Sequence, residues 1–196
     1  MQLILASKSR HRAKLLSDAG LHFDACDAEV DERAVEEVLG SDVSPDDQAQ
    51  ILAEIKATTA SQRFPDALVL GCDQILALGD EILHKAIDFE AARANLLKLS
   101  GKTHTLYSAI ALATRGEIVW SLTVPAYMTM RKLDPGYIGR HLAFAGDAVL
   151  GSVGCYQIEG PGLQLFEKIE GDYWTIIGLP LLPLMAELRA RGAIDG

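Results

Sequence analysis

This sequence has few cysteines, no long apolar run and no excess of basic residues. Its three cysteines (Cys26, Cys72 and Cys155) are widely spaced and form no metal-ligand pattern, so we expect free thiols in a reducing, cytoplasmic compartment. No run approaches the roughly 18 apolar residues of a membrane span, and the N-terminal residues lack the regions of a signal peptide. A formal net charge of −9 argues against a general nucleic-acid-binding protein. We therefore expect neither a nucleic-acid nor a membrane partner.

The length and composition are those of a globular chain. Its 196 residues can bury a sizeable core in one domain, or in one domain with a small lobe. Strand and helix patterns alternate along the chain, which predicts an α/β fold with a mixed, curved sheet. The predicted strands cover residues 2–6, 21–25, 68–76, 103–114, 117–130 and 165–169. One predicted helix begins after the turn at 7–9, and a second follows a loop within 28–39. The other predicted helices cover 45–63, 89–99, 134–145 and 179–191.

Residues 2–16 combine a strand pattern, a turn with two hydroxyls, and a helix whose first turn carries two arginines and a histidine. A helix N-terminus offers unpaired N–H groups and a partial positive charge, so cations placed there favour a negative partner. A bound phosphate is one interpretation. The other is a serine cap followed by solvated basic side chains. These residues alone leave both open.

An aspartate interrupts the apolar run LVLGCDQIL at residue 73. A buried, unpaired carboxylate is costly, so Asp73 should bind a metal, pair with a cation or take part in chemistry. A loop-capping aspartate at the strand end is the alternative. Gln74 should point to the opposite face if the strand continues, or share the site with Asp73 if the strand ends there.

Several further polar residues are ambiguous when taken one at a time. Lys56 lies on the mainly apolar face of the helix predicted over 45–63, and Lys85 follows a histidine in a turn; a single lysine is more often solvated. The carboxylates at 29, 31 and 32 could hold a hard divalent cation, or be merely exposed. Glu159 lies in GCYQIEGPG, where glycines let the backbone approach a ligand, although a plain turn is the alternative.

Four segments and their order along the chain are typical of one family. They are LASKSRHRAKLL, LGCDQIL, LHKAIDFEAARANLLKLSGKTHTLYS and GCYQIEGPGLQLFEKIEGDYWTIIGLPL, with EVDE and the helix bearing Lys56 between them. In these segments the chain resembles the Maf family of nucleoside triphosphate pyrophosphatases. The resemblance implies a single domain over residues 1–196 with an inosine-triphosphatase-like fold. That fold is an elongated mixed β-sheet with flanking helices and a cleft between two lobes, usually in a homodimer.

The activity implied by the resemblance is hydrolysis of a nucleoside triphosphate between its α and β phosphates, releasing pyrophosphate. The cofactor implied is Mg²⁺, or another divalent cation such as Mn²⁺. The positions that match the family's functional residues are Asp73 as general base, Ser7, Ser9 and Arg12 in the phosphate loop, Lys56 and Lys85 as two lysines, and Asp31 as the metal ligand. By its chemistry Asp73 could also ligate the metal. These residue types suit the chemistry, because cations neutralise the roughly four negative charges of a triphosphate and a carboxylate can orient water.

Three departures from the family pattern fall on positions linked to base choice, namely His11, Gln74 and Glu159. The branch resembling dTTP and UTP hydrolases carries Arg, Thr and Gln there, and the branch resembling 7-methyl-GTP hydrolases carries an aromatic residue, Gln and Glu. A carboxylate at 159 can accept hydrogen bonds from both the guanine N1–H and amino group, a donor pair that thymine and uracil lack. Cationic 7-methylguanine also suits a flat π surface. We therefore predict house-cleaning of non-standard nucleotides, with 7-methyl-GTP as the substrate.

Two other functions remain open at the level of sequence. One is a dTTP or UTP pyrophosphatase with the same chemistry. The other is a catalytically weak, septum-regulating binding protein, which is favoured by the departures in the phosphate loop and opposed by the retained Asp73, Asp31, Lys56 and Lys85. A cysteine nucleophile is disfavoured because nothing demands a covalent step. Arg10, which replaces the family's proline, has no assigned role.

Overall fold

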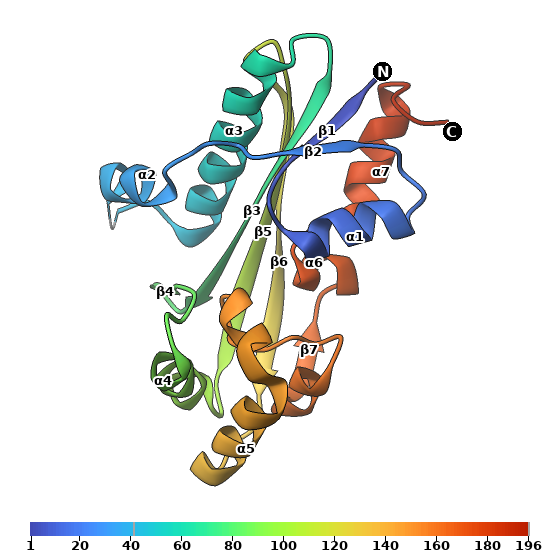
Figure 1. Cartoon of the computed structure of the whole chain (residues 1–196). Helices are drawn as coiled ribbons and strands as arrows, with labels where there is room; N and C mark the ends of the chain where they lie inside the picture. Colours follow the sequence, from blue (N-terminus) through green and yellow to red (C-terminus); the bar gives the residue numbers. More distant parts are fainter. Residues whose placement is uncertain (41, 196) are drawn as a thin grey trace. The chain divides into compact units, whose positions relative to one another are not determined.

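A computed structural model describes residues 1–40 and 42–195 of the chain (Figure 1). The strands are β1 (Leu3–Ala6), β2 (Asp24–Cys26), β3 (Leu68–Leu78), β4 (Glu81–Leu83), β5 (Thr103–Thr114), β6 (Glu117–Met130) and β7 (Phe166–Glu170). The α-helices are α1 (Arg10–Asp18), α2 (Glu32–Leu39), α3 (Pro45–Arg63), α4 (Phe89–Leu99), α5 (Pro135–Ala145), α6 (Tyr173–Ile177) and α7 (Leu181–Ala190). Two 3-10 helices are η1 (Gly146–Gly151) and η2 (Pro161–Leu165).

The strands form one mixed sheet in the order β2-β1-β3-β5-β6-β7, with β4 paired to β3. β1 runs parallel to both β2 and β3, whereas the β3–β4 and β6–β7 pairs are antiparallel. The predicted α/β class with a mixed sheet is therefore confirmed. The chain forms two compact units: unit 1 comprises Met1–Gln74, Tyr107–Val124 and Asp172–Gly196, and unit 2 comprises Ile75–Leu106 and Pro125–Gly171.

Most predicted elements lie where the sequence pattern put them, and the errors concern short elements. The strand predicted over 21–25 is the shorter β2, which begins at Asp24. Leu21 and Phe23 precede this strand and pack against the core. The helix predicted from 179 begins at Leu181, with Pro180 at its N-cap. The pattern missed β4, α6 and both 3-10 helices, which are too short to show a period.

The core of unit 1 follows the two-residue period of its central strands. Leu5, Leu70 and Cys72 belong to a cluster that contains residues of α1 and α7, whereas Ile4 and Val69 belong to a second cluster with Ala60 of α3. Helices therefore cover both faces of these strands within unit 1 (Figure 1). Since alternate residues of β3 face opposite helices, Asp73 falls on the α3 face and Gln74 on the α1 face.

A glycine lets α3 approach β3 closely. A Cβ atom added at Gly71 would lie 2.2 Å from the Ala53 carbonyl oxygen and 2.5 Å from the Ala57 nitrogen. Both are helix backbone atoms, which cannot move aside as a flexible side chain would. Gly71 therefore sets the short separation at which Lys56 of α3 reaches Asp73 of β3.

We expect Gly71→Ala to lower the free energy of unfolding by about 2 kcal/mol, since the added methyl group overpacks this helix–strand contact. Urea denaturation of the purified variant measures the change. Gly151→Ala is the matched control, because a Cβ atom at Gly151 meets nothing within 4 Å. Equal stabilities of the two variants would contradict the assigned role of Gly71.

Unit 2 contains a buried polar pair among its aromatic residues. His104 Nε2 lies 2.7 Å from the Tyr156 hydroxyl oxygen, and the Tyr156 ring packs edge-on against Phe166 with their centroids 4.7 Å apart. Burial lowers the pKa of His104 to about 4 and raises the pKa of Tyr156. The pair is therefore neutral at neutral pH.

We expect His104 to make unfolding easier in mild acid. The pKa of His104 is about 4 in the folded chain and about 6.5 in the unfolded chain, so the unfolded chain binds more protons between these values. The free energy of unfolding should therefore fall as the pH falls through this window, by on the order of 3 kcal/mol over the whole window and by roughly 2 kcal/mol between pH 7 and pH 5. Urea denaturation at about pH 7 and about pH 5 measures the fall.

The control for this acid sensitivity is His104→Gln, which keeps a polar side chain and removes the titration. It should lose much of the pH dependence, whereas His22→Gln, at an exposed histidine, should retain it. The same pH dependence in wild type and in both variants would show that His104 is not responsible.

Candidate active site

A buried ion pair joins α3 to β3 in unit 1. Lys56 Nζ lies 2.6 Å from Asp73 Oδ1 and 2.7 Å from Glu32 Oε1. The Lys56 and Asp73 side chains are each 9% exposed, and that of Glu32 is 53% exposed. The prediction of a buried, partnered Asp73 is therefore confirmed. The loop-capping alternative is wrong, because β3 continues to Leu78. A carboxylate held in this way has a fixed orientation and an adjacent cation.

The turn before α1 presents two serine hydroxyls. Ser9 is the N-cap of α1, and its Oγ accepts a hydrogen bond from the Arg12 backbone nitrogen at 3.3 Å. Ser7 Oγ accepts from the Ser9 backbone nitrogen at 3.2 Å. Both oxygens act as acceptors within the turn, so each hydroxyl hydrogen can still be donated. The predicted serine cap is present, and it is compatible with a bound phosphate.

Arg12 is anchored by the backbone on both sides. Its Nε donates to the Gly178 carbonyl oxygen at 2.9 Å, and one terminal nitrogen donates to the Cys72 carbonyl oxygen at 3.0 Å and to Ser7 Oγ at 3.4 Å. A guanidinium has five N–H donors, and these contacts use at most three. Because Cys72 directly precedes Asp73, the Arg12 side chain lies beside the strand position that carries the buried carboxylate.

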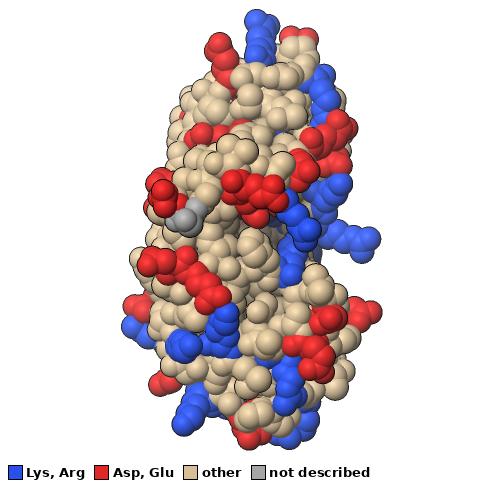
Figure 2. Space-filling model, turned by 90° about the vertical axis from the view of Figure 1, so that its left-hand side faces the viewer, with Lys and Arg blue, Asp and Glu red and all other residues tan. Residues whose placement is uncertain are grey.

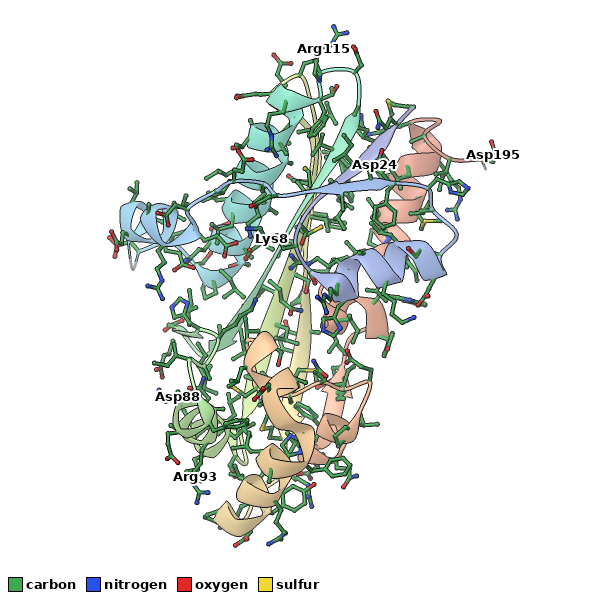
Figure 3. The ribbon with its side chains drawn as sticks, in the orientation of Figure 1. Lys8, Asp24, Asp88, Arg93, Arg115 and Asp195 are labelled. Atoms are coloured by element: carbon green, nitrogen blue, oxygen red, sulfur yellow. The ribbon has the colours of Figure 1, made fainter. Side chains whose placement is uncertain are left out.

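The other cations of the first segment are more exposed. Lys8, labelled in Figure 3, extends from the turn between β1 and α1, and its Nζ lies 2.6 Å from Asp27 Oδ2. Arg10 and His11 are exposed in the first turn of α1. Arg12, in contrast, is half-buried and is hydrogen-bonded to Cys72 of β3 and to Gly178, the C-cap of α6.

Of the three carboxylates at 29, 31 and 32, the one that contacts Lys56 is Glu32, and not Asp31, the residue that the resemblance implies as a metal ligand. Asp31 is the exposed N-cap of α2, and its Oδ1 accepts from the Ala34 backbone nitrogen at 3.2 Å. Glu32, the next residue, makes the contact with Lys56. The sequence did hold a signal that Asp31 would face its own helix. Aspartate is a preferred N-cap residue, and a capping carboxylate accepts hydrogen bonds from the first turn of the helix that it caps.

Two predicted site residues belong to unit 2. Lys85 is exposed in the segment between β4 and α4, and Glu159 is exposed in the turn before η2. The structure thus brings Ser7, Arg12, Lys56 and Asp73 together within unit 1, and describes Lys85 and Glu159 in unit 2.

The cysteine thiols are not activated. Cys72 and Cys155 are buried, and burial raises the pKa of Cys72 to about 11 and also raises the pKa of Cys155. A thiolate is the nucleophilic form, so raised pKa values oppose a covalent step. All three cysteines are free, as predicted.

The carboxylates of unit 1 suit a divalent cation that arrives with other ligands. Among residues 1–40 and 42–195, no three His, Cys, Asp or Glu side chains are grouped closely enough to hold a metal. Mg²⁺ commonly uses one or two carboxylates, with substrate phosphates and water completing its shell. Asp73 and Glu32, both in contact with Lys56 Nζ, are two carboxylates that could serve in this way.

The surface carries charges of both signs. Figure 2 shows acidic side chains interspersed with Lys and Arg over the face that it presents. This face has none of the continuous basic surface that binding to nucleic acid phosphates would need. Within the described part of the chain, no helix is long and apolar enough to cross a membrane.

Comparisons with known proteins identify close relatives. Residues 2–191 match the family model described as Maf-like protein. A protein from Mesorhizobium japonicum is 61% identical, and one from Brucella abortus is 58% identical; the alignments span 100% of this chain and 98% and 99% of those proteins. One from Rhizobium johnstonii is 52% identical over 100% of this chain and 98% of its own length. All three are named 7-methyl-GTP pyrophosphatase.

Proposed function

The chain belongs to the Maf-like protein family, and we propose that it hydrolyses nucleoside triphosphates to nucleoside monophosphates and pyrophosphate, with 7-methyl-GTP as its preferred substrate. The observation that carries the reaction is the arrangement around β3. Arg12 is bonded to the carbonyl oxygen of Cys72, and the next residue is the buried, lysine-paired Asp73. An anion-binding arginine thus adjoins a carboxylate suited to act on water.

Phosphate binding falls to the first turn of α1. The hydroxyls of Ser7 and Ser9 donate to phosphate oxygens, and Arg12 adds a fixed guanidinium whose remaining N–H groups face the anion. The N-terminus of α1 contributes its partial positive charge. Lys85, which the resemblance implies as a further cation, stays a prediction. These groups offset the charge that builds up on the phosphates and on the departing pyrophosphate.

Asp73 orients and deprotonates the attacking water. As the water oxygen bonds to phosphorus, the bond between the α and β phosphates breaks, pyrophosphate leaves, and the water proton passes to the carboxylate. Lys56 keeps Asp73 in place through the 2.6 Å contact, and Glu32 forms a second ion pair with the same Lys56 ammonium group. Mg²⁺, held by Asp73 together with Asp31 or Glu32, would supply charge neutralisation on the phosphates.

The preference for 7-methyl-GTP rests on Glu159 and on the relatives. Glu159 offers two acceptor oxygens to the guanine N1–H and amino group, and relatives 52% to 61% identical carry the name 7-methyl-GTP pyrophosphatase. His11, exposed at the start of α1, offers a flat ring to the cationic base.

A substrate panel tests this function. We expect pyrophosphate release with Mg²⁺, and a kcat/KM for 7-methyl-GTP at least about tenfold above those for GTP, dTTP and UTP. Glu159→Gln should reduce this preference while leaving hydrolysis of UTP nearly unchanged. A higher kcat/KM on dTTP or UTP would instead assign the pyrimidine-specific alternative. Binding without turnover of any triphosphate would assign the catalytically weak, septum-regulating binding protein.

The remaining expectations from the sequence analysis stay predictions. They are a homodimer, a cytoplasmic location and the identity of the divalent cation. Sedimentation of the purified chain tests the first. Activity after chelation and readdition of Mg²⁺ or Mn²⁺ tests the last.

A further inference from the structure

Gln74 lies on the opposite face of β3 from Asp73 and is bonded to the end of α6. Its Nε2 lies 2.8 Å from Ser108 Oγ, 3.0 Å from the Ile176 carbonyl oxygen and 3.3 Å from the Thr175 carbonyl oxygen. An amide nitrogen has two hydrogen atoms to donate, and these three acceptors engage both. The donor side of the Gln74 amide is therefore committed to the protein itself.

Ser108 completes this contact from β5. It is fully buried, and its Oγ donates to the Thr175 carbonyl oxygen at 2.7 Å while accepting from Gln74. The other end of α6 is capped by Asp172, which accepts from the Thr175 backbone nitrogen at 2.9 Å. The last turn of α6 is thus tied to β3 and β5 by hydrogen bonds to its carbonyl groups.

The same turn holds Arg12. Gly178 ends α6 with φ of 112°, its N–H donates to the Trp174 and Thr175 carbonyl oxygens, and its own carbonyl oxygen accepts from Arg12 Nε at 2.9 Å. A Cβ atom added at Gly178 would lie 3.5 Å from Gln74 Oε1 and 3.6 Å from Arg12 Nε. Gln74, the end of α6 and the Arg12 guanidinium therefore form one packed cluster in unit 1.

We propose that Gln74, together with Ser108, is a positioning residue for Arg12: it holds the end of α6 so that the Gly178 carbonyl fixes the guanidinium toward phosphate. This inference deepens the proposed function, since it rests on phosphate binding by Arg12. Gln74 then contributes to the affinity for the phosphate chain, which is the same in every triphosphate. The inference removes Gln74 from the residues that read the base.

The test compares base selectivity with phosphate affinity. Gln74→Met keeps the length of the side chain and removes the amide, and should lower kcat/KM for 7-methyl-GTP and UTP by the same factor, about tenfold. The ratio of the two values should stay unchanged. The dissociation constant of inorganic tripolyphosphate, which has no base, should rise by a similar factor in calorimetry. Gln50→Met is the matched control, because its amide bonds to Glu54 and Ser121 within unit 1.

Two further variants exclude a merely structural effect. Gln74→Glu keeps the shape but presents an acceptor to the carbonyl groups of α6, so it should weaken tripolyphosphate binding at least as much as Gln74→Met. In a chain that already carries Arg12→Ala, Gln74→Met should add less than a twofold further loss of tripolyphosphate binding. If Gln74→Met acted only through a general loss of folding, its whole effect on tripolyphosphate binding would appear in the Arg12→Ala background as well.

Other outcomes would overturn the assignment. A selectivity ratio that shifts more than about threefold while tripolyphosphate binding is unchanged would make Gln74 a direct reader of the base. Wild-type behaviour of Gln74→Met, or full additivity with Arg12→Ala, would also overturn it. The proposed function fails separately, if the wild-type chain hydrolyses no triphosphate. Tripolyphosphate binding by wild type, Gln74→Met and the double variant tests the positioning role even then.

Discussion

Replacing Asp73 by asparagine should lower kcat about 1,000-fold while leaving the affinity for 7-methyl-GTP within a few-fold of wild type. Asparagine has nearly the same volume and keeps an oxygen that can accept from Lys56, but it cannot take the proton of the attacking water. Arg12 and the serine hydroxyls, which we propose bind phosphate, make their hydrogen bonds elsewhere in unit 1. Pyrophosphate release under saturating substrate measures kcat, and calorimetry without divalent cation measures binding.

The matched control for Asp73→Asn is Asp66→Asn. Asp66 belongs to the same unit, and its side chain is 93% exposed, so the same chemical change there should leave kcat unaltered. Near-normal turnover by Asp73→Asn would remove Asp73 from the reaction. Lost binding together with lost turnover would point to a role in holding substrate or metal.

The buried carboxylate could be predicted because the physics is local. A charge inside LVLGCDQIL must lie in a strand that the surrounding apolar residues bury, and two-residue periodicity then separates Asp73 from Gln74. Gly71, two residues earlier on the same face, had no such signal. Its importance depends on the distance to α3, which a single strand does not encode.

The partners of these residues could not be predicted from the pattern. Glu32 meets Lys56 because α2 begins at the capping Asp31 and turns the next side chain toward α3. Arg12 is fixed by Gly178, the C-cap of a helix of five residues that has no detectable period. Contacts of this kind arise from tertiary packing between segments distant in sequence, so the residue types at a site are easier to find than the groups that orient them.

Replacing Lys56 by methionine should lower the free energy of unfolding by about 3 to 5 kcal/mol, and should abolish turnover as well. Methionine fills much of the volume of the lysine stem, but it leaves Asp73 buried without a cation and facing Glu32 across the vacated ammonium position. An uncompensated buried charge is more costly than the absence of the whole pair. Urea denaturation near neutral pH measures the loss, and pyrophosphate release measures turnover.

Two comparisons separate this cause from a general packing defect. Lys98→Met removes a lysine paired with Glu81 at an exposed position, and should change stability by less than about 1 kcal/mol. In the double variant Lys56→Met with Asp73→Asn the buried charge is gone, so the double variant should be more stable than Lys56→Met alone. If the second substitution instead destabilises the chain further, lost packing around the lysine stem, and not the stranded carboxylate, accounts for the effect. Recovered stability with turnover still absent would show that turnover needs this ion pair and that a stable fold does not.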